Sequence, residues 1–261
     1  MRVKMALSQP RRVLMLTMCC LLVALMTACH APQRPALTLS VAASLQDAIT
    51  EAESVYQREH GPVDFRNNFG ASGTLAREIE DGAPVDAFIA AGGRPMDQLQ
   101  TEAMLQPGSR MNLLRNSLVL IAPRGSSLQG FEQLGGSQVK LVALGDPASV
   151  PAGLYGKQTL EALHLYDKIS SKLVLGKDVR QVLTYVETGN ADAGLVYATD
   201  ALISNKVRTV AVAPEESHDP IVYPVAEVKT TKNDAAVRVF LAFLTSPEAR
   251  AIFVKHGFTM A

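Results

Sequence analysis

The chain has 261 residues, enough for one large or two small domains, and its 48% hydrophobic and 19% charged residues are typical of a soluble globular protein. Its 25 Lys and Arg residues balance 25 Asp and Glu residues, and no basic run is present. Nucleic acid and anionic membrane surfaces are therefore poor partners.

The first segment resembles an export signal. Four Lys and Arg residues precede an apolar run over 13–26, which is shorter than the roughly 20 apolar residues of a membrane span. The run ends in Thr27-Ala28-Cys29, similar to a lipoprotein cleavage box, with Met26 in place of the usual Leu. We predict a lipoprotein-type signal peptide over 1–28, a lipid anchor on Cys29 and an anchor or linker over 29–36. Ordinary cleavage a few residues later is the alternative.

Export also limits the chemistry that cysteine can carry. Cys19 and Cys20 lie inside the predicted leader, so the mature protein keeps only Cys29. On this prediction an internal disulfide, a thiolate metal site and a cysteine nucleophile are all excluded. The leader holds four of the 25 basic residues and none of the 25 acidic ones, which leaves a mature charge of about −4. Local geometry must therefore hold any anion.

Short β-rich runs alternate with helical segments along the mature chain. In chain order, strands are expected at 37–43, 63–69, 85–91, 118–122, 140–144, 173–175, 194–197 and 209–212. Helical spacing is found at 45–59, 75–81, 154–163, 179–187, 234–244 and 247–256. The alternation predicts βαβ units, and hence an α/β fold with mainly parallel sheets flanked by helices.

Two long extended segments, 116–123 and 221–228, are nearly uninterrupted by polar residues. Each could cross between two lobes. A chain that crosses twice builds one lobe from both of its ends and a second lobe from its middle, with a cleft between them where ligands commonly bind. The alternative is a single doubly wound domain in which both segments are ordinary strands.

Two serines stand where an apolar strand gives way to a helical pattern. Ser44 follows Val41-Ala42-Ala43, and Ser72 follows Phe69-Gly70-Ala71. At such a corner the first amides of the helix lack intrahelical partners, and the helix dipole favours negative charge. Each serine hydroxyl adds one more hydrogen-bond donor.

Two further helix starts and one strand end supply similar groups. Pro151 suits the first helical position, which makes Ala152 the first free amide after it. Asp178 can cap the next helix, so the amide of Val179 lies in the unsatisfied first turn. Tyr197 places a phenol hydroxyl at the end of a predicted strand.

Each of these residues also has an ordinary structural explanation. Ser44 with Asp47 fits a capping box, and Ser72 fits a simple N-cap. Pro151 fits a common helix start, and Tyr197 fits a half-buried aromatic with its hydroxyl at the surface. Taken alone, none of them indicates a ligand site.

The ordered series of motifs resembles the periplasmic molybdate-binding proteins of ABC import systems over residues 37–258. The motifs that carry the resemblance are Ala42-Ala43-Ser44-Leu45, Ala71-Ser72-Gly73-Thr74-Leu75-Ala76, Gly82-Ala83-Pro84-Val85-Asp86, Asn116-Ser117-Leu118-Val119, Gly145-Asp146-Pro147, Val150-Pro151-Ala152-Gly153, Asp178-Val179-Arg180, Val196-Tyr197, Asp200-Ala201, Tyr223-Pro224-Val225 and His256-Gly257-Phe258.

The resemblance implies a two-lobed α/β fold of the type 2 periplasmic binding-protein class, with two crossover strands. The implied lobes are 37–117 with 224–261, and 118–223, and an oxyanion site lies in the cleft between them. It also implies a monomer that delivers its ligand to a membrane permease with a cytoplasmic ATPase. We expect an exported protein with no cofactor besides the bound ligand.

In that family, serine and tyrosine hydroxyls and backbone amides hold the tetrahedral oxyanion. The matching positions in this sequence are Ser44, Ser72, Ala152, Val179 and Tyr197. The serine-rich loop of some members is Ala-Ser-Gly-Thr here, so the resemblance does not extend to a contact from residue 73. Molybdenum is expected only as the bound oxyanion.

Uncharged donors suit molybdate or tungstate. Near neutral pH molybdate is a dianion without a proton, so a site made only of donors can satisfy every oxygen, whereas protonated phosphate needs an acceptor. Rejection of sulfate must depend on size, because a smaller tetrahedron leaves the donors at strained distances. A protein of the same fold tuned to sulfate or another oxyanion is the nearer alternative.

A serine hydrolase is the remote alternative, with Ser72 as its nucleophile. The G-x-S-x-G pattern fails, because Gly70-Ala71-Ser72-Gly73 is followed by Thr74. None of the His residues has a recognisable partner in the sequence. We therefore expect a binding protein and not an enzyme.

Overall fold

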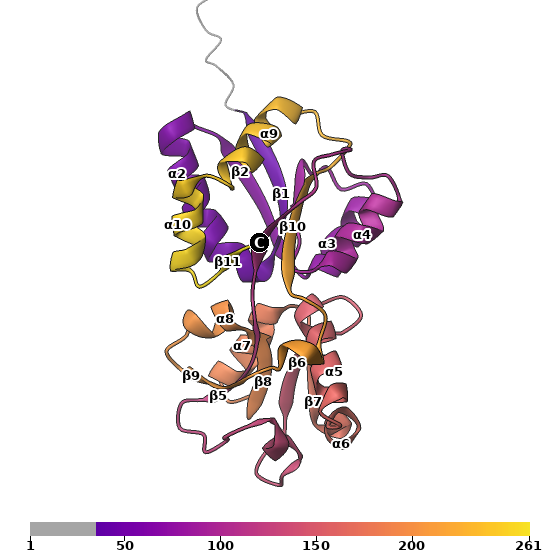
Figure 1. Ribbon diagram of the computed structural model, residues 1–261, viewed down its shortest axis with the longest axis vertical. Helices are drawn as coiled ribbons and strands as arrows, with labels where there is room; N and C mark the ends of the chain where they lie inside the picture. The colour runs from indigo at the N-terminus through magenta and orange to yellow at the C-terminus, as the bar shows by residue number, and fades with distance from the viewer. Residues whose placement is uncertain (1–34) are drawn as a thin grey trace, which may run out of the picture. The chain divides into compact units, whose positions relative to one another are not determined.

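Two β-sheets organise the part of the chain that the computed structural model describes, residues 35–261 (Figure 1). The first sheet has the strand order β11-β4-β10-β3-β1-β2, and the second has the order β7-β6-β8-β5-β9. Both contain parallel and antiparallel pairs and both are flanked by helices. We call each sheet with its helices a lobe. The predicted signal peptide and Cys29 lie outside the described residues.

The first lobe combines the two ends of the described chain. Its strands are β1 (Ala36–Ala42), β2 (Asp64–Gly70), β3 (Ala87–Ile89), β4 (Met111–Arg115), β10 (Val222–Glu227) and β11 (Thr259–Met260). Its helices are the 3-10 turn η1 (Ala43–Leu45), α2 (Gln46–His60), α3 (Ser72–Glu80), α4 (Gly93–Thr101), α9 (Asp234–Phe243) and α10 (Pro247–Lys255). In Figure 1, α2 and α10 lie on one side of the sheet and α3 and α4 on the other.

The second lobe is made from the middle of the chain. Its strands are β5 (Leu118–Pro123), β6 (Val142–Gly145), β7 (Leu173–Gly176), β8 (Ala193–Tyr197) and β9 (Val207–Val212). Its helices are α5 (Pro151–Ala162), α6 (Tyr166–Ile169), α7 (Val179–Glu187) and α8 (Ala198–Leu202), with 3-10 turns η2 (Phe131–Gly135), η3 (Ser170–Lys172) and η4 (Glu215–Ser217).

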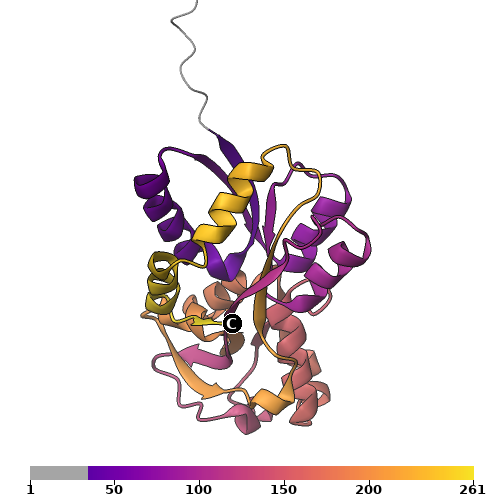
Figure 2. The same ribbon diagram turned by 45° about the horizontal axis from the view of Figure 1, so that its top comes forward.

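The chain passes between the sheets twice, which supports the two-lobed interpretation over the single domain. Only Asn116 and Ser117 separate β4 of the first sheet from β5 of the second, and β10 returns the chain to the first sheet (Figure 2). The lobe boundaries given above, at 117/118 and 223/224, stay a prediction. The strand pairing supports them, although β10 already pairs with β4 from Val222 onwards.

The prediction of mainly parallel sheets is wrong. β1 pairs in parallel with β2 and β3, and β6 with β7 and β8. The strands next to the crossings run the other way: β10 is antiparallel to β3 and β4, and β5 is antiparallel to β8 and β9. A strand that enters a lobe from the other lobe need not follow the βαβ rule, which applies only to strands joined by a helix within one sheet.

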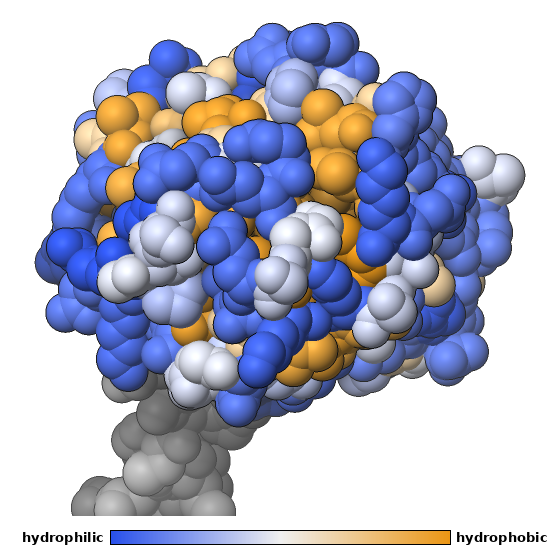
Figure 3. All heavy atoms as spheres, turned by 90° about the horizontal axis from the view of Figure 1, so that it is seen from below, coloured by the Kyte–Doolittle hydropathy of each residue, from blue (hydrophilic) through white to orange (hydrophobic). Residues whose placement is uncertain are grey.

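Burial explains why strands such as β5 appear in the sequence as apolar runs. Leu118, Leu120 and Ile121 in β5 are completely buried, since helices cover both faces of the second sheet. In α7, Val179, Val182, Leu183 and Val186 recur at helical spacing and turn inward. The outer face of the second lobe, seen from below in Figure 3, is mostly hydrophilic with apolar residues interspersed. None of the helices in residues 35–261 is both long and apolar enough to cross a membrane.

Three carboxylates are buried in the first lobe, those of Glu53, Asp86 and Glu227. Glu53 of α2 is 7% exposed, and its two carboxylate oxygens accept from Asn67 Nδ2 at 2.9 and 3.0 Å. Burial raises the pKa of Glu53 from 4.5 to about 7, against the opposing effect of the Asn67 hydrogen bond. Asn67 Oδ1 has no partner among residues 35–261.

Glu53→Gln should therefore stabilise the protein at high pH. Because the pKa of Glu53 is higher in the folded state, its contribution to stability is complete below about pH 4.5 and is lost as the pH rises through about 7. The loss is at most about 3 kcal/mol. Urea unfolding at pH 5, 6.5 and 8 should show a smaller decline in Glu53→Gln than in the wild type. Glu59→Gln, exposed on the same helix, is the control. Equal declines in all three proteins would contradict the assignment.

Candidate oxyanion site

Ser44 lies in the turn that joins β1 to α2. Ala42 has extended backbone angles, and the 3-10 turn Ala43–Leu45 follows it directly. Ser44 is buried, and its Oγ lies 3.1 Å from Tyr223 Oη. No side chain caps this turn or α2, so the capping-box explanation of Ser44 with Asp47 is wrong.

Ser72 is the first residue of α3, and Ala71 before it is the N-cap. The simple N-cap explanation is therefore also wrong. Ser72 Oγ instead accepts from the backbone N–H of Ala91, at 2.9 Å. Because that bond occupies the oxygen as an acceptor, the hydroxyl hydrogen is left for another partner.

Ala152 and Val179 begin helices of the second lobe as expected. Pro151 occupies the first turn of α5, and Asp178 caps α7 by accepting from Gln181 N–H at 2.8 Å. The amides of Ala152 and Val179 therefore lie in first turns, where no intrahelical carbonyl reaches them. Both residues are buried.

Tyr197 is 1% exposed, so the explanation of a half-buried residue with a surface hydroxyl is wrong. Its Oη donates to the carbonyl oxygen of Ala91 in the other lobe, at 3.2 Å. Burial, followed by the nearby tyrosines and Asp200, raises the pKa of Tyr197 well above its usual value. The phenol therefore keeps its proton and remains a donor near neutral pH.

All five predicted residues line one small cavity between the lobes. The cavity is small, with a volume of about 10 Å³. Ser44 and Ser72 line it from the first lobe, and Ala152, Val179 and Tyr197 line it from the second. Asp178 is the one charged residue of the lining, and its carboxylate already caps α7. The cavity therefore presents uncharged donors and no cationic side chain from residues 35–261.

A backbone hydrogen bond joins the lobes outside the lining of this cavity. Gly73 N–H donates to the carbonyl oxygen of Ser149 at 3.0 Å, so residue 73 joins the lobes and does not line the cavity. A Cβ on Gly73 would lie 2.6 Å from that oxygen, which only glycine avoids.

Arg180, next to Val179, forms ion pairs with an acidic residue of each lobe. Its Nη2 donates to Asp47 Oδ2 at 2.7 Å and to the Ser44 carbonyl oxygen at 3.3 Å. Its Nε lies 2.7 Å from Asp200 Oδ1 in an ion pair. Asp200 is completely buried, and burial raises the pKa of its carboxyl to about 6, although Arg180 opposes the shift. The guanidinium thus ties together the two segments that carry Ser44 and Val179.

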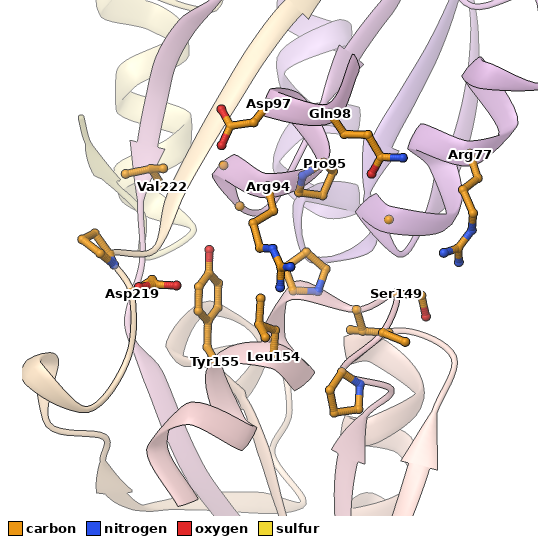
Figure 4. A pocket seen from close by; sticks show the side chains of 18 residues that line it. Arg77, Arg94, Pro95, Asp97, Gln98, Ser149, Leu154, Tyr155, Asp219 and Val222 are labelled. Carbon is orange, nitrogen blue, oxygen red and sulfur yellow. The ribbon is translucent and has the colours of Figure 1, made fainter. Parts of the chain in front are cut away.

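A larger cavity of about 560 Å³ adjoins the small one and shares Val150 and Pro151 with it. Figure 4 shows Arg94 extending from α4 toward the second lobe and Tyr155 extending from α5 toward the first. Its charged lining is mixed, with Arg77 and Arg94 against Asp97 and Asp219. The convergent donors are in the small cavity, so size alone does not mark the site.

The comparison with known families agrees with this geometry. The family described as bacterial extracellular solute-binding protein matches residues 37–259. The chain belongs to this family. It is a binding family and not a catalytic one. The family assignment, the two mixed sheets and the double crossing together confirm the predicted two-lobed type 2 solute-binding fold.

Individual relatives are similar over most of the chain. YvgL of Bacillus subtilis (strain 168), provisionally named an ABC transporter substrate-binding lipoprotein, is 44% identical over 85% of this chain and 86% of its own. The molybdate-binding protein ModA of Escherichia coli (strain K12) is 40% identical over 86% and 89%. A solved substrate-binding domain of a provisionally assigned molybdenum ABC transporter from Clostridium difficile has 41% identity and a TM-score of 0.68, covering 87% of this chain and 99% of its own.

Several residues around the cavity were not assigned a role from the sequence. Arg180, Asp200 and Tyr223 lie inside motifs that carry the resemblance, but nothing in their local patterns indicates their partners. Their contacts join residues far apart in the chain: Arg180 to Asp47 spans 133 positions, and Tyr223 to Ser44 spans 179. Within residues 35–261, no three His, Cys, Asp or Glu side chains gather as a metal site requires.

Gly153→Ala should displace the first turn of α5. A Cβ on Gly153 would lie 1.9 Å from the Gly145 carbonyl oxygen, so the helix would have to move away from β6 and take the Ala152 amide with it. We expect a loss of about 1–3 kcal/mol in unfolding free energy, typical of overpacking, measured by chemical denaturation. Gly125→Ala is the control, because nothing lies within 4 Å of its Cβ position. Equal stability of the two variants would show that the close approach is not needed.

Proposed function

We propose that this protein captures molybdate, and also tungstate, outside the cytoplasm and delivers it to an ABC importer. The observation that carries the proposal is the meeting of five residues with uncharged donor groups, from both lobes, around one small cavity. The ligand-binding residues are Ser44, Ser72, Ala152, Val179 and Tyr197. The names of the relatives, molybdate-binding and molybdenum-transporting, support the same ligand.

The hydrogen-bonding capacity of the cavity supports a fully deprotonated anion. Ser72 accepts from a backbone amide, so its hydroxyl has a hydrogen to offer. Tyr197 stays protonated, and its hydrogen, which the Ala91 carbonyl oxygen accepts, would have to turn from that oxygen to reach the anion. The amides of Ala152 and Val179 can only donate. A protonated phosphate would bring a hydrogen that meets another donor, whereas molybdate brings only acceptors.

Neutral donors also suit a protein that must release its cargo. A Lys or Arg in direct contact with the anion would add a strong charge-assisted bond that transport must later break. Arg180 lies beside the cavity but not in its lining, and its guanidinium is engaged by Asp47 and Asp200. Its charge can favour an anion nearby without a direct bond.

The proposed partners are a membrane permease and its cytoplasmic ATPase, with this protein acting as a monomer. We further propose export through the 1–28 leader and anchoring by a lipid on Cys29. The similarity to YvgL, named a lipoprotein, supports the anchor. Mass spectrometry of the mature N-terminus should find a diacylglyceryl-modified Cys29. An unmodified N-terminus beyond residue 29 would contradict it.

Thermal unfolding with an oxyanion panel tests the ligand. Molybdate and tungstate should raise the melting temperature, because a ligand that binds only the folded state stabilises it. Sulfate and phosphate at the same concentration should have little effect. Equal shifts with all four anions would contradict the specificity, and a shift with sulfate alone would establish the alternative ligand.

Substitution of single donors tests the site. Ser44→Ala and Tyr197→Phe should each weaken molybdate binding by about 1–3 kcal/mol, the usual cost of an unmatched buried polar group. Tyr197→Phe should fall at the lower end, since its hydroxyl already has a protein acceptor, the Ala91 carbonyl oxygen. Isothermal titration calorimetry gives the affinities.

The matched controls are Ser54→Ala and Tyr185→Phe, on α2 and α7 away from the cavity lining. Their affinities should equal that of the wild type. Unchanged affinity in Ser44→Ala would show that this serine has only a structural role.

A further inference from the structure

Tyr223 lies directly behind Ser44, outside the lining of the small cavity. It is completely buried in β10, and its Oη lies 3.1 Å from Ser44 Oγ and 3.1 Å from Asn116 Nδ2. Asn116 stands at the first crossing between the lobes. A chain of three side chains therefore runs from the crossing to the cavity.

The direction of this chain follows from the partners of Asn116. Asn116 Oδ1 accepts from the backbone N–H of Ser117 at 2.9 Å, and a backbone N–H can only donate. The amide nitrogen must therefore be Nδ2, which donates to Thr199 Oγ1 at 2.9 Å and to Tyr223 Oη. The phenol accepts from Asn116, and Ser44 Oγ is the other group within residues 35–261 that shares a hydrogen bond with it, so Ser44 is the acceptor available to the phenol hydrogen.

Ser44 Oγ then accepts from Tyr223, and its own hydrogen has no partner among residues 35–261. The hydroxyl hydrogen of Ser72 is likewise left for another partner, because the Ala91 amide donates directly to Ser72 Oγ. Burial raises the pKa of Tyr223 well above its usual value, so this phenol also keeps its proton near neutral pH.

We propose that Asn116 and Tyr223 are positioning residues that orient the Ser44 hydroxyl as a hydrogen-bond donor toward the anion. This inference rests on the proposed function and extends it to selectivity. Without the relay, Ser44 could turn its hydrogen to Tyr223 and its lone pairs to the cavity. The relay would thus help to favour an oxyanion without a proton over one that carries a proton.

The replacement Tyr223→Phe removes the relay and keeps the packing. The ring contacts Tyr197 and Phe258, with centroids 5.7 and 5.4 Å apart, and phenylalanine can preserve both contacts. Melting curves without ligand would confirm that the variant is folded. Tyr56→Phe, another buried tyrosine of the first lobe, is the matched control.

A double-mutant cycle with sodium molybdate, read by calorimetry, tests the inference. Tyr223→Phe should weaken binding about 5-fold to 20-fold in the wild type and equally in the Ser72→Ala background. In the Ser44→Ala background the same change should alter affinity by less than about 2-fold, because the group that Tyr223 orients is gone. Tyr56→Phe should have no effect in any background.

An equal loss from Tyr223→Phe in all three backgrounds would show a structural role and overturn the relay. So would no loss in the wild type. Both results leave the proposed function intact if the wild type binds molybdate. A wild-type protein that does not bind molybdate would instead overturn the proposed function, and the relay with it.

Discussion

The structure depends on a local excess of hydrogen-bond donors. Within residues 35–261, the amides of Ala152 and Val179 have no intrahelical acceptor because they begin helices. Ser72 Oγ accepts from the Ala91 amide, and Ser44 Oγ shares a hydrogen bond with Tyr223 Oη. Buried donors without acceptors are costly. Under the proposed function, an anion that accepts from these groups would remove this cost and so stabilise the arrangement of the lobes around it.

The scaffold explains how such groups can be collected without any cationic side chain. Where a strand leads into a helix, the first turn of the helix places hydrogen-bond donors at the end of the strand. The double crossing brings such strand-to-helix turns from the two sheets opposite one another. Glycine allows the close approach, since Gly73 and Gly153 lie against the Ser149 and Gly145 carbonyl oxygens where a side chain would collide. The cationic side chain of Arg180 lies outside the cavity lining and forms ion pairs with Asp47 and Asp200.

Local features of the sequence predicted most of the elements and singled out the five residues, because helix starts and buried strands have short-range signals. The resemblance to the molybdate-binding family was needed to join the five into one site, and the helices α4 and α8 were missed. Pro151 and Asp178 mark their helices directly, and β5 is an unbroken apolar run. Strand direction has no such signal, so antiparallel pairing at the crossings was missed. β4 was also missed, since Met111 and Arg115 at its ends remain partly or fully exposed and mask its two buried leucines. The Asn116–Tyr223–Ser44 chain joins residues up to 179 positions apart, and only the fold brings them together.

Ala91 joins the two lobes through its own backbone groups. Its N–H donates to Ser72 and its carbonyl oxygen accepts from Tyr197, so a single residue at the end of a short strand bonds to one hydroxyl from each side of the cleft. One backbone position therefore holds a serine of one lobe and a tyrosine of the other in register, so a change in the peptide geometry at Ala91 would displace both hydroxyls together.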